Sequence, residues 1–309
     1  MISSSCISAD NAGIGYVRWS DPKEGGFSLE IPSQWYASGG TFRFSAFDAR
    51  SAVHVASPDG RININIQDEN VPSFTRPMHV GVISIKEGQW YTPAPGAGKM
   101  YVLRYLPGKE FAEWYANQFG AIGSTDLTIL ERRDRPDASE TIQNLILKYG
   151  LSQTISSGEV FFSCIKNKEL MKGYCFAQTI DTGSVWTIHY LVSYLAPSSQ
   201  EEMAQSVLNH MLLSTQPNPE WVRAHQGNLM KYQEMVTSHN AAIADIITKS
   251  YEARQETQEK VMQEVSNTIQ DRIDLIDPTT RRTFNEESGF RYYWYCPARD
   301  HVLRTNDPL

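Results

Sequence analysis

Histidines are the first residues to consider for chemistry, because an imidazole can bind a metal ion or transfer a proton near neutral pH. The chain has seven: His54, His79, His189, His210, His225, His239 and His301. None stands at metal-ligand spacing from another histidine, a cysteine or a pair of carboxylates. His189 follows Trp186 in an apolar stretch, which favours a hydrogen-bonded core or surface histidine over a catalytic base. The histidines therefore predict neither a metal site nor a catalytic residue.

Residues 96–99, Gly-Ala-Gly-Lys, are similar to the end of a phosphate-binding loop, but two positions break that motif. Pro93 replaces the required earlier glycine, and Met100 stands where a hydroxyl group would coordinate magnesium. The chain also has no Gly-x-Ser-x-Gly motif of a nucleophilic serine. We therefore expect no cofactor and no catalytic nucleophile.

The four cysteines are too few and too scattered for a disulfide framework: Cys6, Cys164, Cys175 and Cys296. Cys164 and Cys175 lie on two strand-like runs joined by residues 166–172, so a disulfide between them is one expectation. Two free thiols on neighbouring strands are the other, and the strict distance requirement of a disulfide favours this second interpretation.

The charge of the chain argues against a nucleic-acid partner. It carries 28 basic and 35 acidic residues, a net charge of −7, and it has no cluster of lysine and arginine that could neutralise phosphates. No apolar stretch reaches the roughly 18 residues that cross a bilayer, so we expect no membrane span. Residues 1–11 lack the basic and apolar regions of a signal peptide. This predicts a cytoplasmic protein if Met1 is the native start, and an extracytoplasmic one if a leader has been removed.

The spacing of apolar residues predicts an α+β fold, an antiparallel β-sheet body with packing helices over residues 27–215, after an N-terminal extension over 1–26. The expected strands are 27–31, 41–47, 53–56, 61–67, 101–105, 126–132, 141–149, 159–165, 173–180 and 184–195. One helix is expected from Gly108 to Gly120. A second helix begins at Ser198, where Ser198 and Glu201 have the spacing of a capping box, and its apolar stripe includes Met203.

Residues 70–98 interrupt this pattern with prolines, glycines and isolated apolar residues. So long an irregular segment inside a compact domain indicates a binding loop or a disordered one. Trp90 and Tyr91 lie in it, and we expect Trp90 to be exposed as an interface residue.

The segment 216–219, Gln-Pro-Asn-Pro, ends the body, and Asn218 is placed to cap a new helix with Pro219 in its first turn. Residues 216–277 then predict a long, coiled-coil-like helical arm. Its apolar seam supplies further interface candidates: Leu229, Tyr232, Val236 and Ile243. Residues 278–309 predict a short three-stranded β-meander. Its aromatic strand contains Tyr293, Trp294 and Tyr295, which form either an interface or a small core.

Residues 26–35, Gly-Phe-Ser-Leu-Glu-Ile-Pro-Ser-Gln-Trp, are similar to the Gly-Phe-Ser-x-x-x-Pro-x-x-Trp start of the PsbP/Mog1-like proteins. The order of strands, central helix, strands and closing helix over 27–215 also resembles that group. The resemblance implies an antiparallel sheet sandwiched by helices and a protein that acts through binding. Residues 70–98 and the C-terminal arm depart from the family pattern, so no partner or functional residue is carried over.

Two functions remain after these observations. The first is a non-catalytic protein-interaction or assembly module, whose arm mediates self-association or docks a protein partner, because an isolated helix is only marginally stable. The second is a small-ligand-binding protein or hydrolytic enzyme with a pocket under residues 70–98.

Overall fold

The computed structural model describes residues 14–45, 48–80, 83–93, 98–140, 143, 153–224, 230–269, 271–278, 280–297 and 301–307. The chain divides into two compact units, Met1–Ile247 and Thr248–Leu309, which are treated separately below. The predicted boundary at 216–219 lies inside the first unit. The first part of helix α5 (Met230–Ile269) belongs to that unit, because Ile243 and Ile247 pack into its hydrophobic core.

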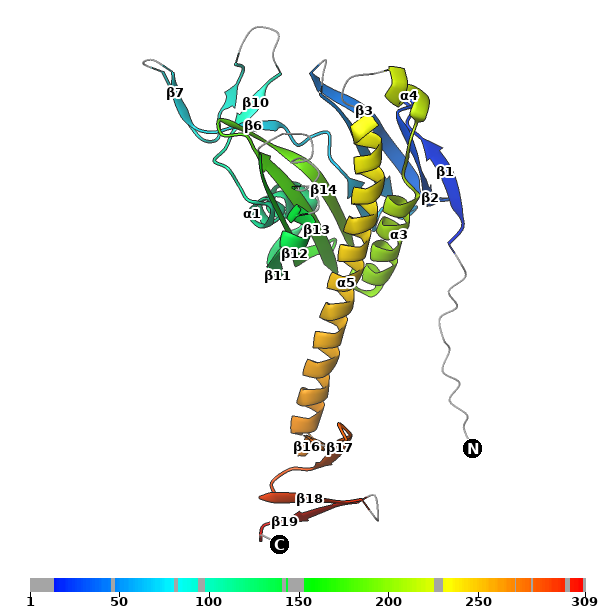
Figure 1. The fold of residues 1–309 in the computed structure, drawn as a ribbon, viewed down its shortest axis with the longest axis vertical. Coiled ribbons are helices and arrows are strands. Elements are labelled where there is room, and N and C mark those ends of the chain that lie inside the picture. The colour runs from blue at the N-terminus through cyan, green and yellow to red at the C-terminus, as the bar shows by residue number, and fades with distance from the viewer. Residues whose placement is uncertain are drawn as a thin grey trace. The chain divides into compact units, whose positions relative to one another are not determined.

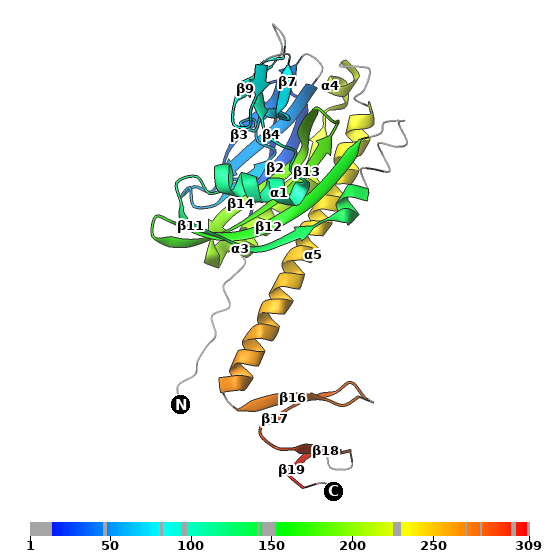
Figure 2. The same cartoon turned by 90° about the vertical axis from the view of Figure 1, so that its left-hand side faces the viewer.

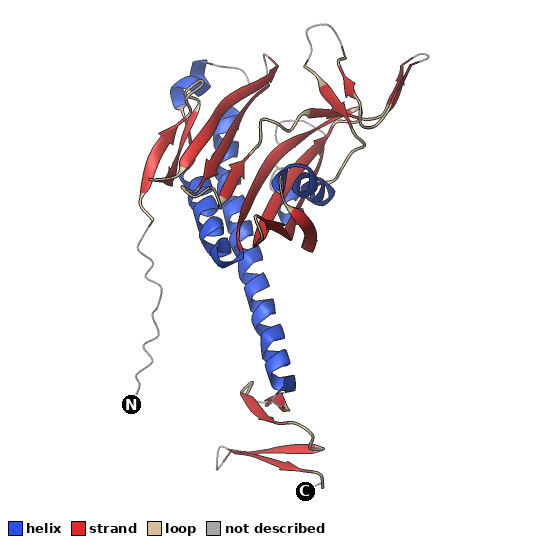
Figure 3. Cartoon of the chain, turned by 180° about the vertical axis from the view of Figure 1, so that it is seen from behind, coloured by secondary structure: helices blue, strands red, loops and turns tan. Residues whose placement is uncertain are grey.

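The first unit is built on a large, mainly antiparallel sheet with the strand order β11-β12-β13-β14-β5-β4-β3. Figure 3 draws the strands in red. The strands of this sheet are β3 (Tyr36–Ser45), β4 (Asp48–Ala56), β5 (Asn63–Ile66), β11 (Thr125–Asp134), β12 (Thr154–Lys166), β13 (Glu169–Asp181) and β14 (Val185–Pro197). The turn of Pro58 and Gly60 joins β4 to β5 as expected, with Val55 opposite Ile64. The predicted α+β class with an antiparallel sheet is confirmed.

Helices cover both faces of this sheet (Figures 1 and 2). On one face, Phe111 and Tyr115 of α1 (Gly108–Tyr115) pack with Val160 of β12 in one hydrophobic cluster. On the other face, α3 (Glu201–Ser214) and the first part of α5 pack in a second cluster with Tyr174 and Val192. Alternate side chains of β13 and β14 therefore pack into the two clusters on opposite faces of the sheet. Because both faces are buried, the sequences of these strands are nearly continuous apolar runs.

A small sheet joins the N-terminal segment to the end of α3. It consists of β1 (Tyr16–Ser20), β2 (Phe27–Pro32) and β15 (Gln216–Pro217), with β2 in the middle. Residues 16–20, predicted to be part of an extension, are thus a paired strand of the first unit. Residues 1–13 of the predicted extension lie outside the described residues.

The prediction of an irregular segment over 70–98 is wrong for its described part, which contains four short strands. They are β6 (Ser73–Thr75), β7 (Met78–Val80), β8 (Ile83–Ile85) and β9 (Trp90–Tyr91). β6 pairs with β14 and β10 (Met100–Val102), and Phe74 of β6 is fully buried against Trp186. Phe74 is therefore a strand residue whose partner on β14 is distant in sequence, whereas β7 pairs with its neighbour β8.

Local sequence signals predict the start of one helix correctly and the start of another incorrectly. Helix α1 begins at Gly108, as its Pro-Gly dipeptide predicts. The capping box predicted at Ser198 is wrong. Ser198 lies in a short 3-10 helix (Ser198–Gln200) without a side-chain cap, and Glu201 is paired instead with Lys172 of β13. Met203, expected on the apolar stripe of α3, is 40% exposed.

The predicted strand over 141–149 lies outside the described residues, apart from Gln143, which is helical. Residues 136–140, immediately before it, are also helical. Asn218 caps the following helix as predicted, since its Oδ1 accepts a hydrogen bond from the backbone N–H of Glu220 at 3.0 Å in α4 (Pro219–Ala224).

The second unit contains the rest of α5 and two separate hairpins. The first hairpin pairs β16 (Arg272–Ile276) with β17 (Thr283–Glu287), and the second pairs β18 (Tyr292–Cys296) with β19 (His301–Thr305). The predicted three-stranded meander is therefore wrong, and so is the helical prediction for 272–276. Pro278, expected to stop a helix, lies instead in the turn of the first hairpin, where the Asp277 N–H donates to the carbonyl oxygen of Arg282.

Candidate interaction surface

The predicted apolar seam of α5 is directed in part into this chain's own core. Ile243 is fully buried, and His239 and Ile246 are 2% and 5% exposed. Ile243 belongs to the cluster that includes α3 and the sheet, so the prediction that it contacts another protein is wrong. The three-and-four spacing that indicates a coiled coil is the same spacing that faces a helix toward a sheet.

The structure describes no side chain of the other three seam candidates, so their role at an interface is not tested. Leu229 lies outside the described residues. Tyr232 and Val236 belong to α5, but only their backbone is described. Their proposed role at an interface remains a prediction.

Trp90 is 61% exposed, as expected, and its neighbour Tyr91 is half-buried. The two residues form β9, which pairs with β10, and the Trp90 ring meets the Tyr101 ring edge-on at 5.4 Å between centroids. This contact fixes the indole on the surface. Its use as an interface remains a prediction.

The C-terminal hairpin β18–β19 has two different faces. Trp294 stands directly opposite Leu303 in the strand register, and these side chains are 43% and 45% exposed. Tyr292 lies on the same face, because strand residues two apart point the same way, and its ring stacks with that of Trp294 at 6.4 Å. We call Tyr292, Trp294 and Leu303 the exposed aromatic face.

Tyr293 and Tyr295, the other predicted interface residues of the tail, lie on the opposite face of the hairpin. The Tyr293 hydroxyl donates to the Glu287 carbonyl oxygen at 3.0 Å. The Tyr295 ring packs against Phe284 of β17 at 4.6 Å, which joins the two hairpins. Of the three aromatic candidates, Trp294 alone is on the exposed face. Leu303 was not among the candidates, although the register of the predicted strands pairs it with Trp294.

Polar contacts hold the second unit together where a hydrophobic core would be expected. Asn267 near the end of α5 donates to Asp274 at 2.8 Å and accepts from Asn285 at 2.9 Å, and Arg272 also binds Asn285. Among the described side chains beyond residue 247, Val302 is the one hydrophobic residue that is buried. Neither hydrophobic cluster of the protein includes a residue beyond Ile247.

The exposed hydrophobic side chains of the two hairpins extend beyond the aromatic face. Ile273 and Ile276 of β16 are 39% and 64% exposed. The predicted helical arm included Ile273, whereas the structure places it on an exposed hairpin. Two short hairpins with outward-facing hydrophobic residues and little buried surface gain stability when another surface covers them.

Cys164 and Cys175 are both buried and free, so the expectation of a disulfide between them is wrong. Cys164 stands opposite Met171, whereas Cys175 stands opposite Val160, four residues farther along β12. Four residues of a strand span about 13 Å, nearly twice the limit for a disulfide. Both side chains contribute to the same hydrophobic cluster, and burial raises the pKa of Cys175 well above its usual value.

Two cavities in the first unit give no support to the predicted pocket under residues 70–98, because no residue of that segment lines either of them. Within the described ranges, no three histidine, cysteine or acidic side chains come together as a metal-binding group. In the same part of the chain, no helix combines the length and apolar character needed to cross a membrane.

No family model matches this chain, and no curated protein matches its sequence. The resemblance of residues 27–215 to PsbP/Mog1-like proteins therefore remains a prediction.

Proposed function

We propose that this chain is a non-catalytic assembly protein, whose C-terminal unit associates with a second copy of the same chain through the exposed aromatic face. The observation that carries the proposal is the composition of that unit. Its described part buries one hydrophobic side chain, Val302, while Trp294, Leu303 and Ile276 stay exposed. Covering these three side chains would remove apolar surface from water, which is the main favourable term in association.

The charge of the second unit supports a second copy as the partner. Residues 248–309 include nine basic and eleven acidic residues, a net charge of −2. A nearly neutral unit can meet its own copy without strong like-charge repulsion. Arginines also lie over aromatic rings beside the face: Arg291 is 5.9 Å from the Tyr292 centroid, and Arg304 is 5.6 Å from that of Phe290. Aromatic and arginine side chains are the types enriched at protein interfaces.

The resemblance of the body to PsbP/Mog1-like proteins is in keeping with this proposal, because most members of that group act through binding. In this interpretation the first unit is a stable body with its own two cores, and the second unit is the part that associates.

Light scattering coupled to size exclusion tests the proposal on the full chain. The wild type should form a dimer or a larger assembly. In the double variant Trp294→Ser, Leu303→Ser, the dissociation constant of the assembly should be about 30-fold higher, because truncating a central interface tryptophan typically costs about 2 kcal/mol or more of binding free energy.

The matched control is Trp90→Ser, which removes an exposed tryptophan from a short strand of the first unit. This control should assemble as the wild type does, and circular dichroism should show the same secondary structure for all three proteins. A wild type that stays monomeric at the highest concentration, or a double variant that assembles unchanged, would show the proposal to be wrong.

A further inference from the structure

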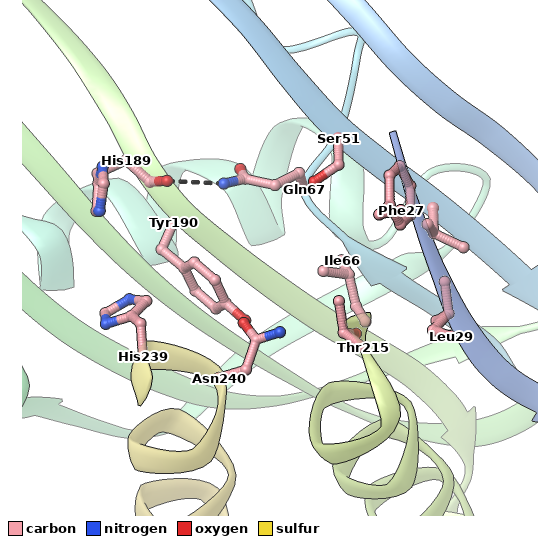
Figure 4. A pocket seen from close by; sticks show the side chains of 11 residues that line it. Phe27, Leu29, Ser51, Ile66, Gln67, His189, Tyr190, Thr215, His239 and Asn240 are labelled. Carbon is pink, nitrogen blue, oxygen red and sulfur yellow. Dashed lines mark hydrogen bonds between the residues drawn. The ribbon is translucent and has the colours of Figure 1, made fainter. Parts of the chain in front are cut away.

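A cavity of about 60 Å³ lies in the first unit between strand β14 and helix α5 (Figure 4). One side of it is apolar, with Phe27, Leu29 and Ile66 among its residues. Polar side chains from β14 and α5 form the other side, which includes His189 and His239. None of the eleven lining residues is an aspartate, glutamate, lysine or arginine. The cavity thus combines an apolar wall with uncharged polar groups, as small-molecule sites do.

A β-bulge shapes the polar side. In the pairing of β13 with β14, Gln178 is opposite Tyr190 and Thr179 is opposite Ile188, so His189 is an extra residue without a partner position. Ile188 and Tyr190 would share one face of a regular strand. Because of the bulge, Ile188 packs in the cluster under α1, and Tyr190 packs in the cluster on the α5 side. Bulges that redirect a side chain are over-represented beside functional sites.

Gln67 holds the bulge in place at the end of β5. Its backbone N–H donates to the Leu191 carbonyl oxygen at 2.7 Å, and its Nε2 donates to the His189 carbonyl oxygen at 2.7 Å (Figure 4). Gln67 has φ of 56°, in the left-handed region that few residues other than glycine adopt. A strained residue that fixes a bulge from both its backbone and its side chain indicates a conformation maintained for a purpose.

His239 presents unused hydrogen-bonding groups at this cavity. It is 2% exposed, and neither Nδ1 nor Nε2 has a hydrogen-bond partner among the described residues. Its ring meets the Tyr190 ring edge-on at 4.5 Å, and the Tyr190 hydroxyl is engaged with Asn240 Oδ1. Buried polar atoms almost always have a partner, so this side chain calls for one.

Burial lowers the pKa of His239 to about 3, and the neighbouring His189 contributes to the shift. Burial also lowers the pKa of His189 to about 4, with Arg50 as the second cause. Both imidazoles are therefore uncharged at neutral pH. An uncharged imidazole has one nitrogen that donates and one that accepts a hydrogen bond.

We infer that this cavity binds a small neutral molecule, or the end of one, with the size and hydrogen-bonding pattern of a carboxamide. Its volume of about 60 Å³ is several times the roughly 10–15 Å³ that one water molecule needs, which suits a group of a few non-hydrogen atoms. No lining residue carries a charge, which disfavours an ionic ligand, and the nearby Arg50 already donates to the Ile188 carbonyl oxygen and to Thr187. A carboxamide offers both a donor and an acceptor to His239, and its alkyl substituent would contact the apolar wall at Leu29.

The test is a nuclear magnetic resonance titration of the full-length protein with three probes of the same shape. Acetamide has the donor and the acceptor, acetone has the acceptor alone, and acetate has a negative charge. Acetamide should shift the imidazole resonances of His239 and His189, with a dissociation constant of about 1–10 mM, the range expected for so small a ligand. Acetone should bind about tenfold more weakly because it leaves a buried group without a partner, and acetate should cause no shift.

Two variants localise the binding. His239→Phe removes both ring nitrogens, and Val53→Ile adds a methylene to the cavity from β4 while leaving His239 in place. Both should weaken acetamide binding severalfold. Val53→Ile serves as the check if His239→Phe does not fold.

Several outcomes would overturn the inference. These are the absence of a shift with acetamide, equal shifts with acetone or acetate, and unchanged acetamide binding in both variants. If zinc chloride perturbs the His189 and His239 resonances and acetamide does not, the site is a metal site and the inference is wrong. If no probe binds, the cavity holds water alone.

Discussion

The buried imidazole of His239 should make the stability of the first unit depend on pH, and replacing His239 by glutamine should remove the part of that dependence that His239 contributes. The unfolded chain protonates this histidine at its ordinary pKa of about 6.5, whereas in the folded protein burial holds its pKa at about 3. Between these values the unfolded chain binds more protons than the folded one. Stability therefore falls as the pH decreases through this window.

The size of the effect follows from the two pKa values. At about pH 5 the unfolded histidine is almost fully protonated and the folded one is not, which costs about 2 kcal/mol relative to about pH 7.5. His189 adds a further loss of the same sign, and that loss is present in the wild type and the variant alike.

The assay is urea denaturation at about pH 7.5 and about pH 5, followed by tryptophan fluorescence. Six of the seven tryptophans lie before residue 248, so the signal reports mainly on the first unit. The wild type should lose about 2 kcal/mol more between the two pH values than His239→Gln does. His79→Gln, which changes an exposed histidine, is the control and should behave as the wild type. If His239→Gln and the wild type lose the same stability, the imidazole is not buried in its neutral form.

Three further predictions concern packing, hydrogen bonding and thiol access. Gly158→Ala would place a methyl group 2.4 Å from the backbone of α1. It should lower the free energy of unfolding, measured by urea denaturation, by about 1–3 kcal/mol. Gly120→Ala is the control and should cost little, because the nearest atom to its methyl group would be 3.6 Å away. Asp21 is 4% exposed, and the hydrogen bonds that it accepts outweigh the effect of burial and lower its pKa. Asp21→Asn should therefore lower the free energy of unfolding by about 2 kcal/mol at neutral pH. The difference from the wild type should shrink as the pH falls through the low pKa of Asp21 in the folded protein. In the native protein a thiol reagent should modify the exposed Cys296 and leave the buried Cys175 unmodified until urea is added, as mass spectrometry would show.

Short-range signals in the sequence were sufficient for several elements. The turn at Pro58 and Gly60, the start of α1 at Gly108 and the Asn218 cap all depend on residues within one turn of chain. The α+β class also follows from local alternation, since strands with one buried face repeat every two residues. These features are confirmed because their physical causes are complete within a few residues.

Predictions that required pairing partners failed where the partner lies far away in the sequence. The heptad-like spacing of α5 does not say what the helix packs against, and tertiary structure placed Ile243 on this chain's own sheet. Residues 272–276 have apolar residues compatible with a helix, but pairing with β17 made them a strand. The separation of Cys164 from Cys175 was decided by the β12–β13 register, which the two thiols do not themselves indicate.

The two candidate sites also depend partly on local sequence and partly on tertiary structure. The sequence by itself determined an aromatic tail that includes Trp294 and whose rings form either an interface or a small core. Only the tertiary structure decided which side of the tail is exposed, because the contact of Tyr295 with Phe284 covers the other side. The cavity beside His239 depends on a bulge in β14, the glutamine that follows β5 and a helix some 50 residues beyond the bulge. No local pattern specifies such a cavity, because it arises where side chains from separate elements meet without filling the space between them.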